Sequence, residues 1–152
     1  MSKFRFRAQA ALDLRRRELQ SAQANLARAE QIREMAAQAV EKASQALAGA
    51  QIAGAEQVRT PRTATELQWY RFWIVRLEHE RRSAQSILAA REGDVARMLA
   101  ACQVAKQRCE SLERAREKMQ RAHERAEEDA ERKLIDELAT TRFNIDKRGF
   151  RL

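Results

Sequence analysis

Apolar residues recur along the chain at alternating steps of three and four, in two long stretches separated by one interruption. The first stretch holds two rows with a seven-residue spacing: Leu12, Leu19, Leu26, Arg33, Val40, Leu47 and Arg15, Ala22, Ala29, Ala36, Ala43, Ala50. The second stretch holds two more: Leu67, Ile74, Arg81, Leu88, Val95, Cys102, Cys109 and Tyr70, Leu77, Ala84, Arg91, Met98, Ala105, Leu112, Met119. A heptad pattern sustained over so many turns predicts coiled-coil helices.

Helix-breaking residues gather between the two stretches: Gly49, Gly54, Thr60 and Pro61. Thr63 and Glu66 then have the T-x-x-E spacing of a capping box, which starts a helix. Asn144 and Gly149 mark the expected end of that helix. The sequence thus predicts three segments within a single domain of residues 1–152: a helix over about 8–53, a connection over about 54–63 and a helix over about 64–142.

Folding the chain back at the interruption brings the rows together as an antiparallel pair. A register centred near residue 58 sets small residues against large ones in these pairs: Ala43 with Ile74, Ala29 with Leu88, Ala22 with Val95, Val40 with Leu77, and Leu19 with Met98. Such pairing lets two helices approach without voids. Arg33 and Arg81 fall opposite alanines and can extend their charged ends to water. The predicted fold is therefore all-α, a long antiparallel two-helix coiled-coil hairpin, in preference to a parallel dimer.

The second helix is expected to project beyond the first, which runs out near Ala8, opposite about Cys109. The apolar stripe continues past that point through Leu112, Met119, Ala126, Ala130, Leu134, Ile135 and Leu138. An apolar stripe on a projecting C-terminal helix predicts a binding face. The alternative is that Phe4 and Phe6 fold back and cover its first turns.

Four aromatic residues crowd the first turns of the second helix: Trp69, Tyr70, Phe72 and Trp73. Tyr70 falls on the seam and Trp73 beside it, whereas Trp69 and Phe72 fall on the outer face. Arg76 follows on the next turn of the same face. Exposed aromatic and arginine residues are typical of binding hot spots, so this stripe is a candidate protein-binding site. The alternative is that the aromatics fold over the loop at the hairpin tip.

The composition agrees with long helices and leaves little to fill a globular core. Of 152 residues, one is Pro, four are Gly and 5% are aromatic. A net charge of +8 at pH 7 favours an acidic partner, but interleaved acidic residues argue against a continuous basic stripe for nucleic acid. The basic N-terminus lacks the apolar stretch of a signal peptide, and no apolar run approaches the roughly 20 residues of a membrane span. We expect a cytoplasmic protein that binds no nucleic acid and does not insert into the membrane.

No group of residues has the spacing of a catalytic or metal site, and no cofactor is implied. His79 and His123 are isolated along the second helix. Cys102 and Cys109, seven residues apart, would have Cα atoms about 10 Å apart on one helix, too far for a disulfide; we expect them to be buried seam residues. The basic run 15–17 predicts a solvated helix face or a contact with an acidic partner. The chain is thus expected to be a binding protein and not an enzyme.

Both ends of the chain resemble one known family. The opening FRFR at 4–7, followed by LDLR at 12–15, is similar to the start of the flagellar export protein FliJ. The closing ERKLIDELA at 131–139, then RF at 142–143, resembles that family's C-terminal signature. Length, two-helix layout and basic charge agree with it. A stalk protein of virulence type III secretion, or a generic basic coiled-coil scaffold, is the alternative.

The resemblance implies a central stalk of the flagellar type III export apparatus, at the cytoplasmic face of the inner membrane. Its implied partners are the export ATPase hexamer (FliI) and the export-gate membrane protein (FlhA), together with the ATPase regulator FliH and export chaperones. ATP hydrolysis would belong to the partner. The expected ATPase contacts are Leu112, Met119, Leu134, Ile135 and Leu138. The expected gate contacts are Trp69, Phe72, Trp73 and Arg76.

Overall fold

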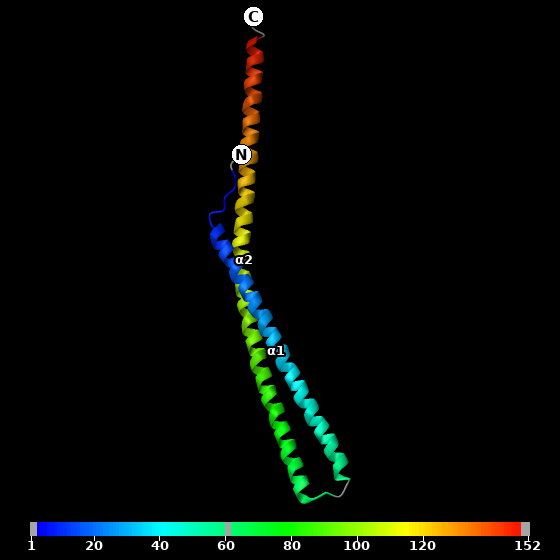
Figure 1. Cartoon of the computed structure of the whole chain (residues 1–152). Coiled ribbons are helices and arrows are strands. Elements are labelled where there is room, and N and C mark those ends of the chain that lie inside the picture. Colours follow the sequence, from blue (N-terminus) through cyan, green and yellow to red (C-terminus); the bar gives the residue numbers. More distant parts are fainter. Residues whose placement is uncertain (1–2, 60–61, 150–152) are drawn as a thin grey trace. The chain divides into compact units, whose positions relative to one another are not determined.

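Two helices make up nearly all of the computed structural model, which describes residues 3–59 and 62–149 (Figure 1). Helix α1 spans Gln9–Val58 and helix α2 spans Ala64–Gly149. The fold is all-α, with the two long helices packed against each other in a hairpin-like arrangement, as the heptad pattern predicts. The predicted breakers Thr60 and Pro61 lie outside the described residues.

Helix α2 begins at the predicted residue because its capping box forms. The backbone N–H of Glu66 donates to Thr63 Oγ1 at 3.4 Å. In return, the backbone N–H of Thr63 donates to Glu66 Oε2 at 3.4 Å. These reciprocal bonds satisfy backbone donors that the first turn of a helix leaves without an intrahelical acceptor.

Both helices run further than the sequence indicates. Helix α1 continues through Gly54 to Val58 instead of ending near residue 53, and α2 continues to Gly149 instead of ending near residue 142. A glycine inside a helix costs about 1 kcal/mol relative to alanine. That cost is too small to end a helix whose stability comes mainly from packing against a partner. The connection expected over 54–63 is therefore shorter, because residues 54–58 belong to α1.

The residues fall into two compact units. One consists of residues 3–18 and 106–149, and the other of residues 19–105. Within each unit, a part of α1 runs antiparallel to a part of α2 (Figure 1). The single domain expected over 1–152 stays a prediction.

Within the unit of residues 19–105, the covered positions follow the predicted rows. The buried residues of these rows are Ala36, Leu47 and Leu77. The half-buried ones include Leu19, Ala22, Leu26, Ala29, Val40, Ala43, Ile74, Arg81, Ala84, Leu88, Val95 and Met98. Arg33, Leu67 and Arg91 are exposed, two of them arginines that extend to water and the third a residue of the first turn of α2. The predicted alternation of three and four residues is therefore seen on the packed face, while supercoiling stays a prediction.

Candidate partner-binding surfaces

Tyr70 ties the first turns of α2 to the last turns of α1. Its hydroxyl donates to the backbone carbonyl of Ala50 at 2.5 Å. Its ring lies over Gly54, where an added methyl group would overlap the ring and its hydroxyl. Gly54 is thus buried inside α1 and makes room for Tyr70, although the sequence suggested a helix breaker. The predicted seam position of Tyr70 agrees with this contact.

The other aromatic residues of this segment face solvent. Trp69 is 73% exposed, Phe72 is 64% exposed, and Trp73 is also exposed. The Arg76 guanidinium lies 5.9 Å from the centroid of the Trp73 ring. Arg76 Nε also donates to Glu80 Oε1 at 3.1 Å. Trp69, Phe72, Trp73 and Arg76, which we call the aromatic stripe, therefore come together on one face of α2.

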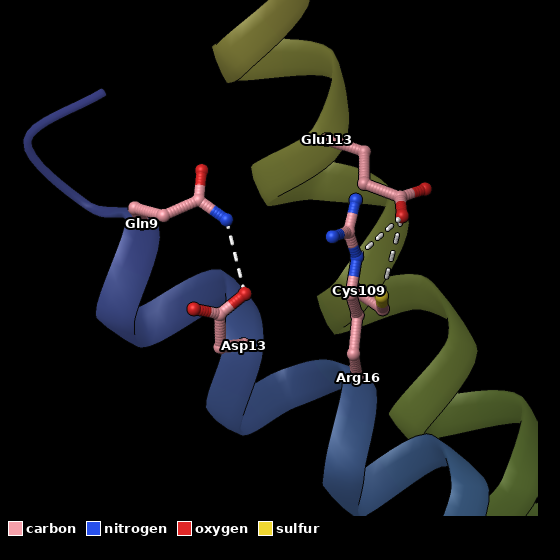
Figure 2. Close-up of polar contacts among 5 residues, drawn as sticks. All are labelled: Gln9, Asp13, Arg16, Cys109 and Glu113. Atoms are coloured by element: carbon pink, nitrogen blue, oxygen red, sulfur yellow. Dashed lines mark hydrogen bonds and ion pairs between the residues drawn. The ribbon is translucent and has the colours of Figure 1, made fainter. Parts of the chain in front are cut away.

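Polar contacts around Cys109 join α1 to α2 in the unit of residues 3–18 and 106–149 (Figure 2). Arg16 Nε donates to Glu113 Oε1 at 3.3 Å, and Cys109 Sγ donates to the same oxygen at 3.8 Å. On α1, Gln9 Nε2 donates to Asp13 Oδ1 at 3.0 Å. Burial of the Cys109 side chain, reinforced by the negative charge of Glu113, raises the pKa of its thiol.

The two cysteines carry no disulfide. Cys109 is buried, whereas Cys102 is half-buried. Leu12, which precedes Arg16 by one turn, is fully buried in the same unit as Cys109. Cys109 is therefore buried between the helices, as its predicted seam position requires.

An N-terminal arm of residues 3–8 continues past the start of α1 and lies along α2 (Figure 1). The Phe4 ring meets the His123 ring edge to face, with 5.6 Å between centroids. Phe4 and Phe6 are half-buried and alternate with two exposed arginines. His123 Nε2 also lies 3.8 Å from Glu127 Oε1, so His123 is not the isolated residue that the sequence indicates. The arm thus folds back onto α2, which is the alternative that the sequence left open for Phe4 and Phe6.

The C-terminal part of α2 is uncovered: every described residue from 128 to 149 is exposed. Four of the five predicted ATPase contacts are between 52% and 63% exposed: Met119, Leu134, Ile135 and Leu138. The fifth, Leu112, is half-buried. We call the four exposed residues, with Ile145, the C-terminal stripe.

Ile145 is a member of this surface that sequence reasoning missed. It is exposed and lies seven residues after Leu138, which places it on the same face of α2. The spacing was visible in the sequence, but the helix was expected to end near residue 142. Val75, also exposed, was likewise missed beside the aromatic stripe.

The described parts of the chain show neither a cluster of metal ligands nor a membrane-spanning helix. Residues 3–59 and 62–149 contain no cluster of three His, Cys, Asp or Glu side chains placed to hold a metal ion. Within those ranges, neither helix has a stretch apolar and long enough to cross a membrane.

A scan of protein-family models matches residues 4–148 to the family described as Flagellar FliJ protein. The chain belongs to the FliJ family. The match covers nearly the whole chain and confirms the resemblance carried by its two ends. FliJ proteins are non-catalytic components of the flagellar type III export apparatus, and the family match makes this chain a component of that apparatus. Searches of curated proteins and of solved structures found no significant match.

Proposed function

We propose that this FliJ protein is a stalk that couples the export ATPase ring to the export gate and assists the escort of export chaperones. The observation that supports the proposal is that each compact unit bears its own exposed apolar stripe on α2. The aromatic stripe belongs to the unit of residues 19–105, and the C-terminal stripe to the other. A protein that bridges two partners needs two such surfaces, and solvent-exposed apolar patches of this kind mark interaction sites.

The C-terminal stripe suits the ATPase pore because most of it lies on a part of α2 that no other described residue covers. A single helix with an apolar stripe can enter a pore and be contacted from several sides, as a coiled-coil helix is by its neighbours. The helix carrying Leu134, Leu138 and Ile145 has no covered residue from 128 onward in the described chain. The projecting helix expected from the sequence is part of this proposal.

The aromatic stripe suits the gate protein. Trp69 and Phe72 are three residues apart, and Arg76 follows four residues later, so one face presents them on consecutive turns. Aromatic side chains on a helix lose little conformational entropy when a partner binds, which favours a transient contact. Tyr70, anchored to α1 on the other side of α2, holds the helix that carries the stripe.

Charged substitutions in the C-terminal stripe test the ATPase contact. Met119→Glu with Leu138→Glu places two carboxylates on the apolar face, and we expect the affinity for purified export ATPase to fall at least about tenfold in a calorimetric titration. Thr140→Glu is the matched control, because residue 140 is exposed and lies on the side of α2 opposite Leu138, two residues away. Circular dichroism should show unchanged helicity for each variant. Equal ATPase affinity of wild type, double variant and control would remove the stripe from the proposal.

A further inference from the structure

The N-terminal arm and α2 border an open pocket of about 320 Å³ that neither predicted surface includes. Its lining consists of Phe4, Arg5, Phe6, Gln9 and Arg116. We propose that this pocket receives a carboxylate side chain from an acidic segment of a partner protein. A water takes up about 30 Å³ of liquid, so the pocket has room for roughly ten waters or for one acidic side chain.

Neither arginine of the pocket has a counter-ion among residues 3–59 and 62–149. Among the ion pairs of the described residues, none involves Arg5 or Arg116. The Nε–H of Arg116 is buried and meets no hydrogen-bond acceptor in the described part of the chain. A buried donor without an acceptor is unfavourable, and more so when the group is charged. An incoming carboxylate would supply the opposite charge that the Arg116 guanidinium lacks.

The nearby carboxylates of the chain are already engaged. Glu113 accepts from Arg16 and from Cys109. Glu117 lies 3.6 Å from Arg121. Both glutamates line a second hollow that shares Arg116 with the pocket, yet neither forms an ion pair with Arg116. A carboxylate that pairs with Arg116 would therefore come from outside the described chain.

The surroundings favour a protein carboxylate over a nucleic-acid backbone. The two phenylalanines make part of the wall apolar, as suits a peptide side chain and its flanking residues. Residues 3–18 carry six basic side chains against two acidic ones, which attracts an acidic segment over a longer range.

Nuclear magnetic resonance on the full-length protein tests this site. The probe is acetylated hexaglutamate amide, and hexaglutamine of the same form is the neutral control. We expect the Arg116 Nε–H signal and the Gln9 side-chain amide signals to shift and saturate with hexaglutamate, and to stay in place with hexaglutamine. Arg116→Gln and Arg5→Gln should each weaken binding about tenfold, as measured at Gln9.

Arg114→Gln is the matched control, because Arg114 is exposed on the same helix but outside the pocket, and it should change binding less than about twofold. An equal loss for Arg114→Gln and Arg116→Gln would mean diffuse attraction and would overturn the proposal. A stronger response to oligothymidylate than to hexaglutamate would overturn the choice of a carboxylate. The contact between the Phe4 and His123 rings reports whether the arm stays docked. If Arg116→Gln abolishes this ring contact, the binding measured for Arg5→Gln tests the proposal instead, because the Arg5 side chain is exposed.

Discussion

Replacing Gly54 with alanine tests the contact that joins the start of α2 to the end of α1. Gly49 and Gly54 both lie inside α1, and alanine is favoured over glycine in a helix interior by about 0.8–1 kcal/mol. A methyl group at Gly49 meets nothing within 4 Å, so Gly49→Ala should stabilise the protein by about that amount. A methyl group at Gly54 would overlap the Tyr70 ring. The two substitutions should therefore have opposite signs.

The magnitude follows from the terms that compete at Gly54. Overpacking against the Tyr70 ring costs about 1–3 kcal/mol. Losing the Tyr70–Ala50 hydrogen bond costs a further ~0.5–1.5 kcal/mol. After the gain in helix propensity, we expect Gly54→Ala to destabilise by about 1–3 kcal/mol. In a Tyr70→Ala background the obstacle is gone, and the same substitution should stabilise by about 0.8–1 kcal/mol.

Urea unfolding followed by circular dichroism measures both effects. The set consists of wild type, Gly49→Ala, Gly54→Ala, Tyr70→Ala and the Gly54→Ala, Tyr70→Ala pair. The sign of the Gly54 effect should reverse between the wild-type and the Tyr70→Ala backgrounds, whereas Gly49→Ala should stabilise the wild-type protein. Stabilisation by Gly54→Ala in the wild-type background, similar to that by Gly49→Ala, would show that the Tyr70 ring does not occupy this space.

Two further predictions concern the exposed and the buried side chains. Trp69→Ala with Phe72→Ala should weaken binding to the gate protein by about 1–3 kcal/mol in calorimetry without lowering the melting temperature, whereas the control Met35→Ala, as exposed as Phe72 at 64%, should leave binding unchanged. A collapse of the melting temperature with gate affinity retained would make the aromatics part of the hairpin packing instead. Iodoacetamide should alkylate Cys102 faster than Cys109 in peptide mass spectrometry, because the raised pKa of Cys109 lowers its thiolate fraction and its side chain is buried. Cys109 should therefore need a higher pH for the same rate, and equal rates at every pH would contradict the packing around it.

Much of the fold could be predicted because it depends on short-range spacing. The rows of Leu47 and Leu77 repeat every seven residues, and such a repeat places them on one face of a helix whatever the partner is. The capping box of Thr63 and Glu66 is equally local, and α2 begins where it predicts. The exposure of Trp69 follows from its place outside those rows.

The features that could not be predicted depend on contacts between distant residues. The sequence shows Gly54 as a breaker, because the Tyr70 ring that lies over it comes from the other helix. The pocket at Arg116 is formed by an arm more than a hundred residues away, and the spacing of residues along α2 carries no sign of it. Ile145 was hidden for a different reason: Asn144 and Gly149 indicated an end to a helix that continues to Gly149.

The central claim is that the chain joins the export ATPase to the export gate through two separate stripes. The direct measurement is retention of purified ATPase on an immobilised cytoplasmic domain of the gate protein, with and without the chain. We expect retention only with the wild-type chain, and loss of it both for Met119→Glu with Leu138→Glu and for Trp69→Ala with Phe72→Ala. Equal retention of the ATPase without the chain, or with either double variant, would contradict the bridging role.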